Sequence, residues 1–103
     1  MKTDKEMFKF FNEFIFMDNS CYGVNIEVDI LRKYIINRFH KAIPATRILT
    51  VLSIIDDIIL KIFNKDLEGI QNDMYEVREN VMYMLDFEKV VEEEKSVEDD
   101  GSE

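Results

Sequence analysis

Residues that interrupt helices are scarce in this chain. Its 103 residues include three glycines and one proline, the two residue types that helix interiors tolerate least. Sheets joined by tight turns usually need glycine, asparagine or aspartate at positions with positive φ, whereas this chain has three glycines and long stretches without glycine or proline. The sequence therefore predicts an all-α protein, and its length predicts a single domain.

The first predicted helix opens with a capping box. Thr3 and Glu6 have the spacing at which the Thr3 hydroxyl and the Glu6 carboxylate each accept a hydrogen bond from the other residue's N–H. One apolar face then follows at spacings of three and four: Met7, Phe10, Phe11, Phe14 and Met17. Phe8 and Phe16 fall off that face. Residues 18–23 are polar, contain turn-forming residues, and predict a loop.

A second helix is predicted from Asn25, as its cap, to about Lys41. Val24, Ile26, Val28 and Ile30 alternate with polar residues, a pattern that is typical of a short strand. Because no convincing partner strand exists in the sequence, a helix is favoured for residues 24–30. The strand remains the alternative.

A third helix is predicted from Pro44, in its first turn, to about Asn64. One narrow strip of it is polar: Thr46, Thr50, Ser53, Asp57, Lys61 and Asn64. Because the rest is mostly Ile, Leu, Val and Phe, we expect this helix to be central and covered on two sides. Asp56 lies on the apolar side and predicts either a core-edge acid paired with a base of the next helix or a functional carboxylate.

The last predicted helix follows Asn64–Asp66 and carries a heptad pattern. It consists of Leu67, Ile70, Met74, Val77, Val81, Met84, Glu88 and Val91, with Glu88 as one charged lapse. This seam packs either within one chain or between two chains. The predicted fold is a small four-helix bundle over residues 1–95 with a central apolar third helix. Residues 96–103 are predicted to form a disordered acidic tail.

Charge and hydrophobicity are distributed unequally along the chain. Residues 86–103 contain nine acidic residues against two lysines, and only four hydrophobic residues. The apolar residues are therefore concentrated in the first 85 residues. A domain of this size buries about 60% of its surface, so we expect some apolar surface to contact another chain. The alternative is a tightly packed monomer.

The sequence offers little catalytic chemistry. Cys21 and His40 are the only cysteine and histidine, too few for a zinc site, and no glycine-rich phosphate loop or Glu-x-x-His pair is present. We expect no enzyme activity, no metal and no cofactor. A single cysteine suits a reducing compartment, so a cytoplasmic location is expected. No membrane span is expected, because the apolar stretch 42–63 contains four charged residues.

These observations predict a non-catalytic interaction or regulatory protein, an adaptor or inhibitor that forms a homodimer, binds another protein, or does both. The residues predicted at its interface are Met74, Val77, Val81, Met84, Phe8 and Phe16. The alternative is a small nucleic-acid-binding regulator, because one acid-free stretch is basic and contains interleaved aromatic residues. The residues predicted to contact a polyanion or an acidic partner are Arg32, Lys33, Arg38, His40, Lys41 and Arg47.

Overall fold

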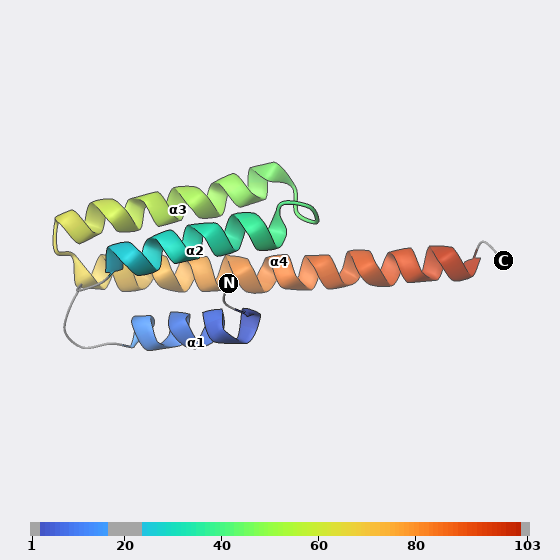
Figure 1. Ribbon diagram of the computed structural model, residues 1–103, viewed down its shortest axis with the longest axis horizontal. Coiled ribbons are helices and arrows are strands. Elements are labelled where there is room, and N and C mark those ends of the chain that lie inside the picture. Colours follow the sequence, from blue (N-terminus) through green and yellow to red (C-terminus); the bar gives the residue numbers. More distant parts are fainter. Residues whose placement is uncertain (1–2, 17–23, 102–103) are drawn as a thin grey trace.

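The computed structural model describes residues 3–16 and 24–101 (Figure 1). Its helices are α1 (Asp4–Ile15), α2 (Val24–Phe39), α3 (Ala45–Phe63) and α4 (Leu67–Gly101). The described part of the chain contains no strand, so the predicted all-α class is confirmed. Consecutive helices run in alternating directions, and α4 extends well beyond the other three (Figure 1). The predicted loop at 18–23 lies outside the described residues.

The start of α1 confirms the predicted capping box. The Thr3 Oγ1 atom accepts from the Glu6 N–H at 3.2 Å, and the Thr3 N–H donates to Glu6 Oε1 at 3.2 Å. These bonds satisfy N–H groups that have no partner inside the helix. The apolar face that follows is buried at Met7, Phe11 and Phe14. Thus α1 starts as its sequence pattern predicts. Of the rest of the predicted face, Phe10 is partly buried against the core, and Met17 lies outside the described residues.

Residues 24–30 form the first turns of α2, so the helix alternative is the one observed. Without a neighbouring strand, only a helix satisfies the backbone N–H and C=O groups of this segment internally. The helix ends at Phe39, whose carbonyl accepts from the Ile43 N–H at 3.0 Å. Pro44 then occupies the N-cap position of α3, one residue before the first turn in which we expected it.

The turn between α3 and α4 confirms the predicted break at residues 64–66. Lys65 has a φ of 57°; the Lys65 N–H donates to the Ile62 carbonyl and the Asp66 N–H to the Lys61 carbonyl, at 3.1 and 3.0 Å. This pattern is a Schellman motif. The Asp66 carboxylate then caps α4 by accepting from the Gly69 N–H at 3.0 Å.

One hydrophobic core joins all four helices, with Phe11, Tyr34, Ile55 and Met74 as buried members from α1, α2, α3 and α4. The α4 heptad supplies one side of this core. Five of its residues are fully buried: Ile70, Met74, Val77, Val81 and Met84. The seam therefore packs within one chain. This corrects the predicted interface role of Met74, Val77, Val81 and Met84, because these side chains have no exposed surface to offer a partner.

The expected position of the third helix also needs correction. Helix α3 contacts both α2 and α4, but these neighbours cover only the face that contains Ile48, Val51, Ile55 and Ile58. The apolar part of α3 is wider than two adjacent helices can cover. A strip of large apolar side chains on α3 therefore faces outward instead of lying at the centre of the fold.

The acidic end of the chain is helical as far as Gly101. The predicted disorder of residues 96–103 is therefore not confirmed, and residues 102–103 lie outside the described part. Glutamate and lysine have good helix propensity. Because α4 is already nucleated by its packed portion, each added residue gains a backbone hydrogen bond without a new nucleation step.

Candidate docking surface

The largest exposed apolar side chains of α3 lie along one face of the helix. Leu49, Leu60 and Phe63 are 63%, 62% and 78% exposed. Leu52 and Ile59 lie between them along the helix and are partly buried against the core. Successive positions three and four residues apart share one face of a helix. We call Leu49, Leu52, Asp56, Leu60 and Phe63 the α3 strip.

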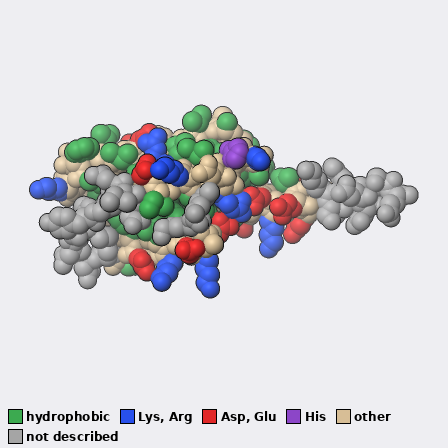
Figure 2. Space-filling view, viewed as in Figure 1, with side chains coloured by type: hydrophobic (Ala, Val, Ile, Leu, Met, Phe, Trp, Pro, Cys, Tyr) green, Lys and Arg blue, Asp and Glu red, His purple; other side chains and the backbone are tan. Residues whose placement is uncertain are grey.

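Hydrophobic side chains gather over α3 along the upper edge of the molecule (Figure 2). Single exposed apolar residues are ordinary on protein surfaces, whereas a contiguous apolar patch marks a contact site. The α3 strip consists of two apolar groups on one face of the helix, Leu49 with Leu52 and Leu60 with Phe63, and Asp56 lies between them. Ile36 on α2 is also exposed and lies one turn after Arg32, on the same face of α2.

An ion pair occupies the middle of the α3 strip. Arg32 Nη1 of α2 donates to Asp56 Oδ1 at 2.8 Å, and both side chains keep substantial exposure. Asp56 is thus paired with a base, as one sequence interpretation held, but the base comes from the preceding helix. Beside this pair lies a hollow of about 170 Å³ lined by Val28, Asp29, Arg32 and Ile59. The α2–α3 face therefore combines exposed apolar side chains with the charged residues Asp29, Arg32 and Asp56.

Arg38 of α2 joins three helices through two carboxylates. Its guanidinium donates to both oxygens of Glu88 on α4, at 2.7 and 2.9 Å, and to both oxygens of Asp4 on α1, at 3.1 and 3.2 Å. Two-pronged contacts of this kind fix geometry as well as charge. The Glu88 lapse in the heptad is thus a cross-helix partner for Arg38.

Buried Tyr34 completes this network by donating from its hydroxyl to Asp4 Oδ1 at 2.6 Å. Burial alone raises the pKa of the Asp4 carboxyl, but the bonds from Tyr34 and Arg38 outweigh burial and lower the Asp4 pKa below its ordinary value. Burial and the bond to Asp4 raise the pKa of Tyr34 well above its ordinary value. The network therefore holds a carboxylate and a neutral phenol together.

Two further contacts fix α3 against α4. Lys61 Nζ donates to Asp73 Oδ2 at 2.7 Å, and this hydrogen bond raises the pKa of Lys61 above its ordinary value. At the other end of α3, the Arg47 guanidinium lies 4.3 Å from the centre of the Tyr83 ring. These contacts hold α3 against α4 near both ends of the helix.

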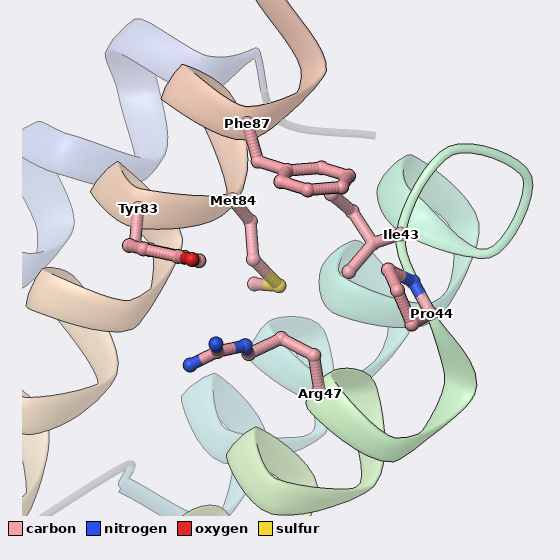
Figure 3. A pocket seen from close by; sticks show the side chains of 6 residues that line it. All are labelled: Ile43, Pro44, Arg47, Tyr83, Met84 and Phe87. Carbon is pink, nitrogen blue, oxygen red and sulfur yellow. The ribbon is translucent and has the colours of Figure 1, made fainter. Parts of the chain in front are cut away.

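Arg47 and Tyr83 also line a small hollow between α3, α4 and the connection before α3 (Figure 3). Its other lining residues are Ile43, Pro44, Met84 and Phe87, and its volume is about 60 Å³. Small-molecule sites usually occupy several hundred Å³. This hollow has room for a few water molecules or one inserted side chain.

Three of the six residues in the predicted basic cluster pair with acids that lie outside this stretch of the sequence. Arg32 pairs with Asp56, Arg38 with Asp4 and Glu88, and Lys33 with Asp29 at 3.2 Å. The His40 ring contacts the Ile36 carbonyl, and Lys41 is exposed. The stretch contains no acid in sequence, but the fold brings acids to it. These six residues do not form one basic face.

The remaining predicted interface residues have different environments. Phe8 is partly buried against the core, whereas Phe16 is 74% exposed at the end of α1. Sequence reasoning missed the α3 strip as a surface, although it placed Asp56 on the apolar side of the helix. The excess apolar width of α3 was the signal.

Among the described residues, none of the helices combines the length and the apolar composition that a membrane span requires. In the same residues, no group of three or more histidine, cysteine or acidic side chains has an arrangement that could hold a metal ion. Comparison with protein-family models, with curated proteins and with solved structures finds no match to this chain.

Proposed function

We propose that this chain is a non-catalytic helical interaction protein that binds another protein chain through the α3 strip. One observation carries the proposal: Leu49, Leu60 and Phe63 are mostly exposed on a helix that is fixed at both ends. Burying side chains of this size stabilises a complex by roughly 1.5–3 kcal/mol each. A helix that is already held by such contacts loses less entropy on binding than a mobile element does.

The polar contacts support binding rather than catalysis as the role of this face. Arg32 and Asp56 are paired, and their side chains stay 40% and 58% exposed, so neither is held in the desolvated state that typically tunes catalytic groups. A polar pair within an apolar surface gives specificity by penalising partners that leave it unmatched. The proposed role is therefore recognition of a complementary protein surface, as an adaptor or inhibitor.

Site-specific photo-crosslinking tests this proposal. A photoreactive amino acid replaces Leu60 in cells that produce the protein, and a matched variant carries it at Asp57, which is exposed on the polar strip of the same helix. We expect covalent adducts with a protein chain from position 60, few from position 57, and loss of the adducts when Leu49→Glu is added. Mass spectrometry identifies the captured chain. Equal labelling from positions 57 and 60, or none from 60, would overturn the proposal.

A further inference from the structure

We infer that the partner of the α3 strip is a second copy of this chain, docked antiparallel about a two-fold axis at Asp56. This inference rests on the proposed function and specifies its partner. The strip is symmetric about Asp56: Leu49 and Phe63 each lie seven residues from it, and Leu52 and Leu60 each lie four residues from it. A two-fold axis at Asp56 therefore brings Leu49 against the partner's Phe63 and Leu52 against the partner's Leu60.

A two-fold interface must be self-complementary, because the same patch occupies both sides of it. The antiparallel register meets this requirement for shape, since each apolar residue of the α3 strip faces an apolar residue. A helix advances 1.5 Å per residue, so the strip from Leu49 to Phe63 covers about 21 Å along the helix axis. Ile36 of α2 widens the surface on one side.

The charges at the axis also balance. Two Asp56 carboxylates approach one another there, and each is already paired with Arg32 at 2.8 Å. The four groups together carry no net charge. Polar groups at an otherwise apolar interface fix register more than they add affinity. Arg32 is therefore required in this arrangement, because without it two like charges would meet at the centre of the interface.

The acidic end of α4 favours the antiparallel arrangement over a parallel one. Helix α4 runs opposite to α3 and extends beyond the start of α3 (Figure 1). An antiparallel two-fold axis places the two α4 ends at opposite ends of the dimer. A parallel pair would bring together two segments that each contain nine acidic residues between 86 and 103, and this repulsion opposes association.

The size of the surface sets the conditions of the test. Stable complexes bury about 800 Å² per partner, and a single helical face is smaller than this. We therefore expect a weak dimer with a dissociation constant on the order of 10 µM. Sedimentation velocity from about 5 to 500 µM should show the shift from monomer to dimer.

Two matched pairs of variants locate the interface. Leu60→Glu should raise the dimer dissociation constant at least ~10-fold, because it places a charge at the interface. Met82→Glu, at an apolar residue of α4 that is 45% exposed, should leave dimerisation unchanged. Arg32→Ala should weaken the dimer, whereas Lys89→Ala, which removes an exposed base of α4, should not. Equal effects within either pair would overturn the assignment of the interface.

Disulfide crosslinking tests the register. Two variants in a Cys21→Ser background carry Leu49→Cys and Phe63→Cys, and one of them has a tag that changes its mass. We expect a mixed disulfide dimer when the variants are combined under oxidising conditions and little dimer from either alone. A parallel pair would crosslink each variant to itself, which would overturn the inference.

The two proposals can fail separately. If the wild-type chain stays monomeric at 500 µM and no mixed disulfide forms, the second-copy inference is wrong. Adducts from position 60 with a different protein chain would then still support the proposed function. If position 60 captures nothing, but the chain dimerises independently of Leu60, both proposals are overturned.

Discussion

Among the described residues other than glycine, Lys65 is the one with a positive φ angle. The left-handed conformation of an L-residue lowers the free energy of unfolding by roughly 1–2 kcal/mol. Glycine is the usual residue at this position of a Schellman motif. Lys65→Gly should therefore raise the free energy of unfolding, by about 0.5–1 kcal/mol after allowing for the greater freedom of glycine in the unfolded chain. Urea unfolding measures this difference.

Lys65→Ala is the control for that prediction. It removes the same charge but keeps a Cβ atom in the left-handed conformation, so it should not stabilise the protein. If alanine stabilised the protein as much as glycine does, the lysine charge and not the backbone would be the cause.

Asp4 predicts a specific pH dependence. Its pKa is lower in the folded protein than the ordinary value of 3.8, so its contribution is present above pH 4 and is lost as the pH falls through the folded-state pKa. Because the carboxylate is partly exposed, we expect a contribution of about 1 kcal/mol. Unfolding free energies measured from pH 7 to pH 2.5 should show a shallower acid loss in Asp4→Asn than in the wild type. Glu13→Gln, on an exposed residue of α1, should leave the slope unchanged.

At the scale of elements, helix α4 uses its heptad to close the core. Val77 is fully buried, so Val77→Asp would place an unpaired carboxylate in an apolar interior and should destabilise the fold by about 4 kcal/mol or more. Met82→Asp introduces the same charge on the exposed side of α4 and should change stability by less than about 0.5 kcal/mol. Thermal unfolding followed by circular dichroism compares the two variants. A folded Val77→Asp protein that had lost only its dimer would contradict the intramolecular seam.

The elements themselves were predictable because their signals are local. The Thr3–Glu6 box, the break at residues 64–66 and the helical spacing of α1 and α4 each involve residues a few positions apart. The partners of Arg38 were not predictable, because Asp4 and Glu88 lie 34 and 50 residues away from it. The sequence shows the bases in residues 32–47, but it does not show which acids the fold places beside them.

The candidate site required tertiary information for a different reason. Periodicity indicated that α3 is apolar over most of its circumference, but it could not specify how much of that surface the neighbouring helices cover. A helix that neighbours cover on two sides can have the same apolar sequence pattern as a helix that they cover on one side. The choice between them depends on where α2 and α4 lie, and this is determined by long-range contacts such as Lys61–Asp73 and Arg47–Tyr83.

For the molecule as a whole, the extension of α4 dominates the shape. The radius of gyration is 15.9 Å and the extents are 58 × 24 × 21 Å, whereas a compact domain of this length has a radius of about 13 Å. Because the extended end carries consecutive acids near the negative end of the helix dipole, its helix should be least stable at low salt. Screening by salt should therefore increase helicity there.

Deleting residues 92–103 tests this account of the extended helix. At concentrations where the chain is monomeric, X-ray scattering should give a radius of gyration closer to the compact value. Far-ultraviolet circular dichroism per molecule should fall because helical residues are lost, and it should become less sensitive to salt. The free energy of unfolding should change by less than about 0.5 kcal/mol, because the exposed end adds little to the core. An unchanged ellipticity per molecule would instead support the disordered tail that composition predicts.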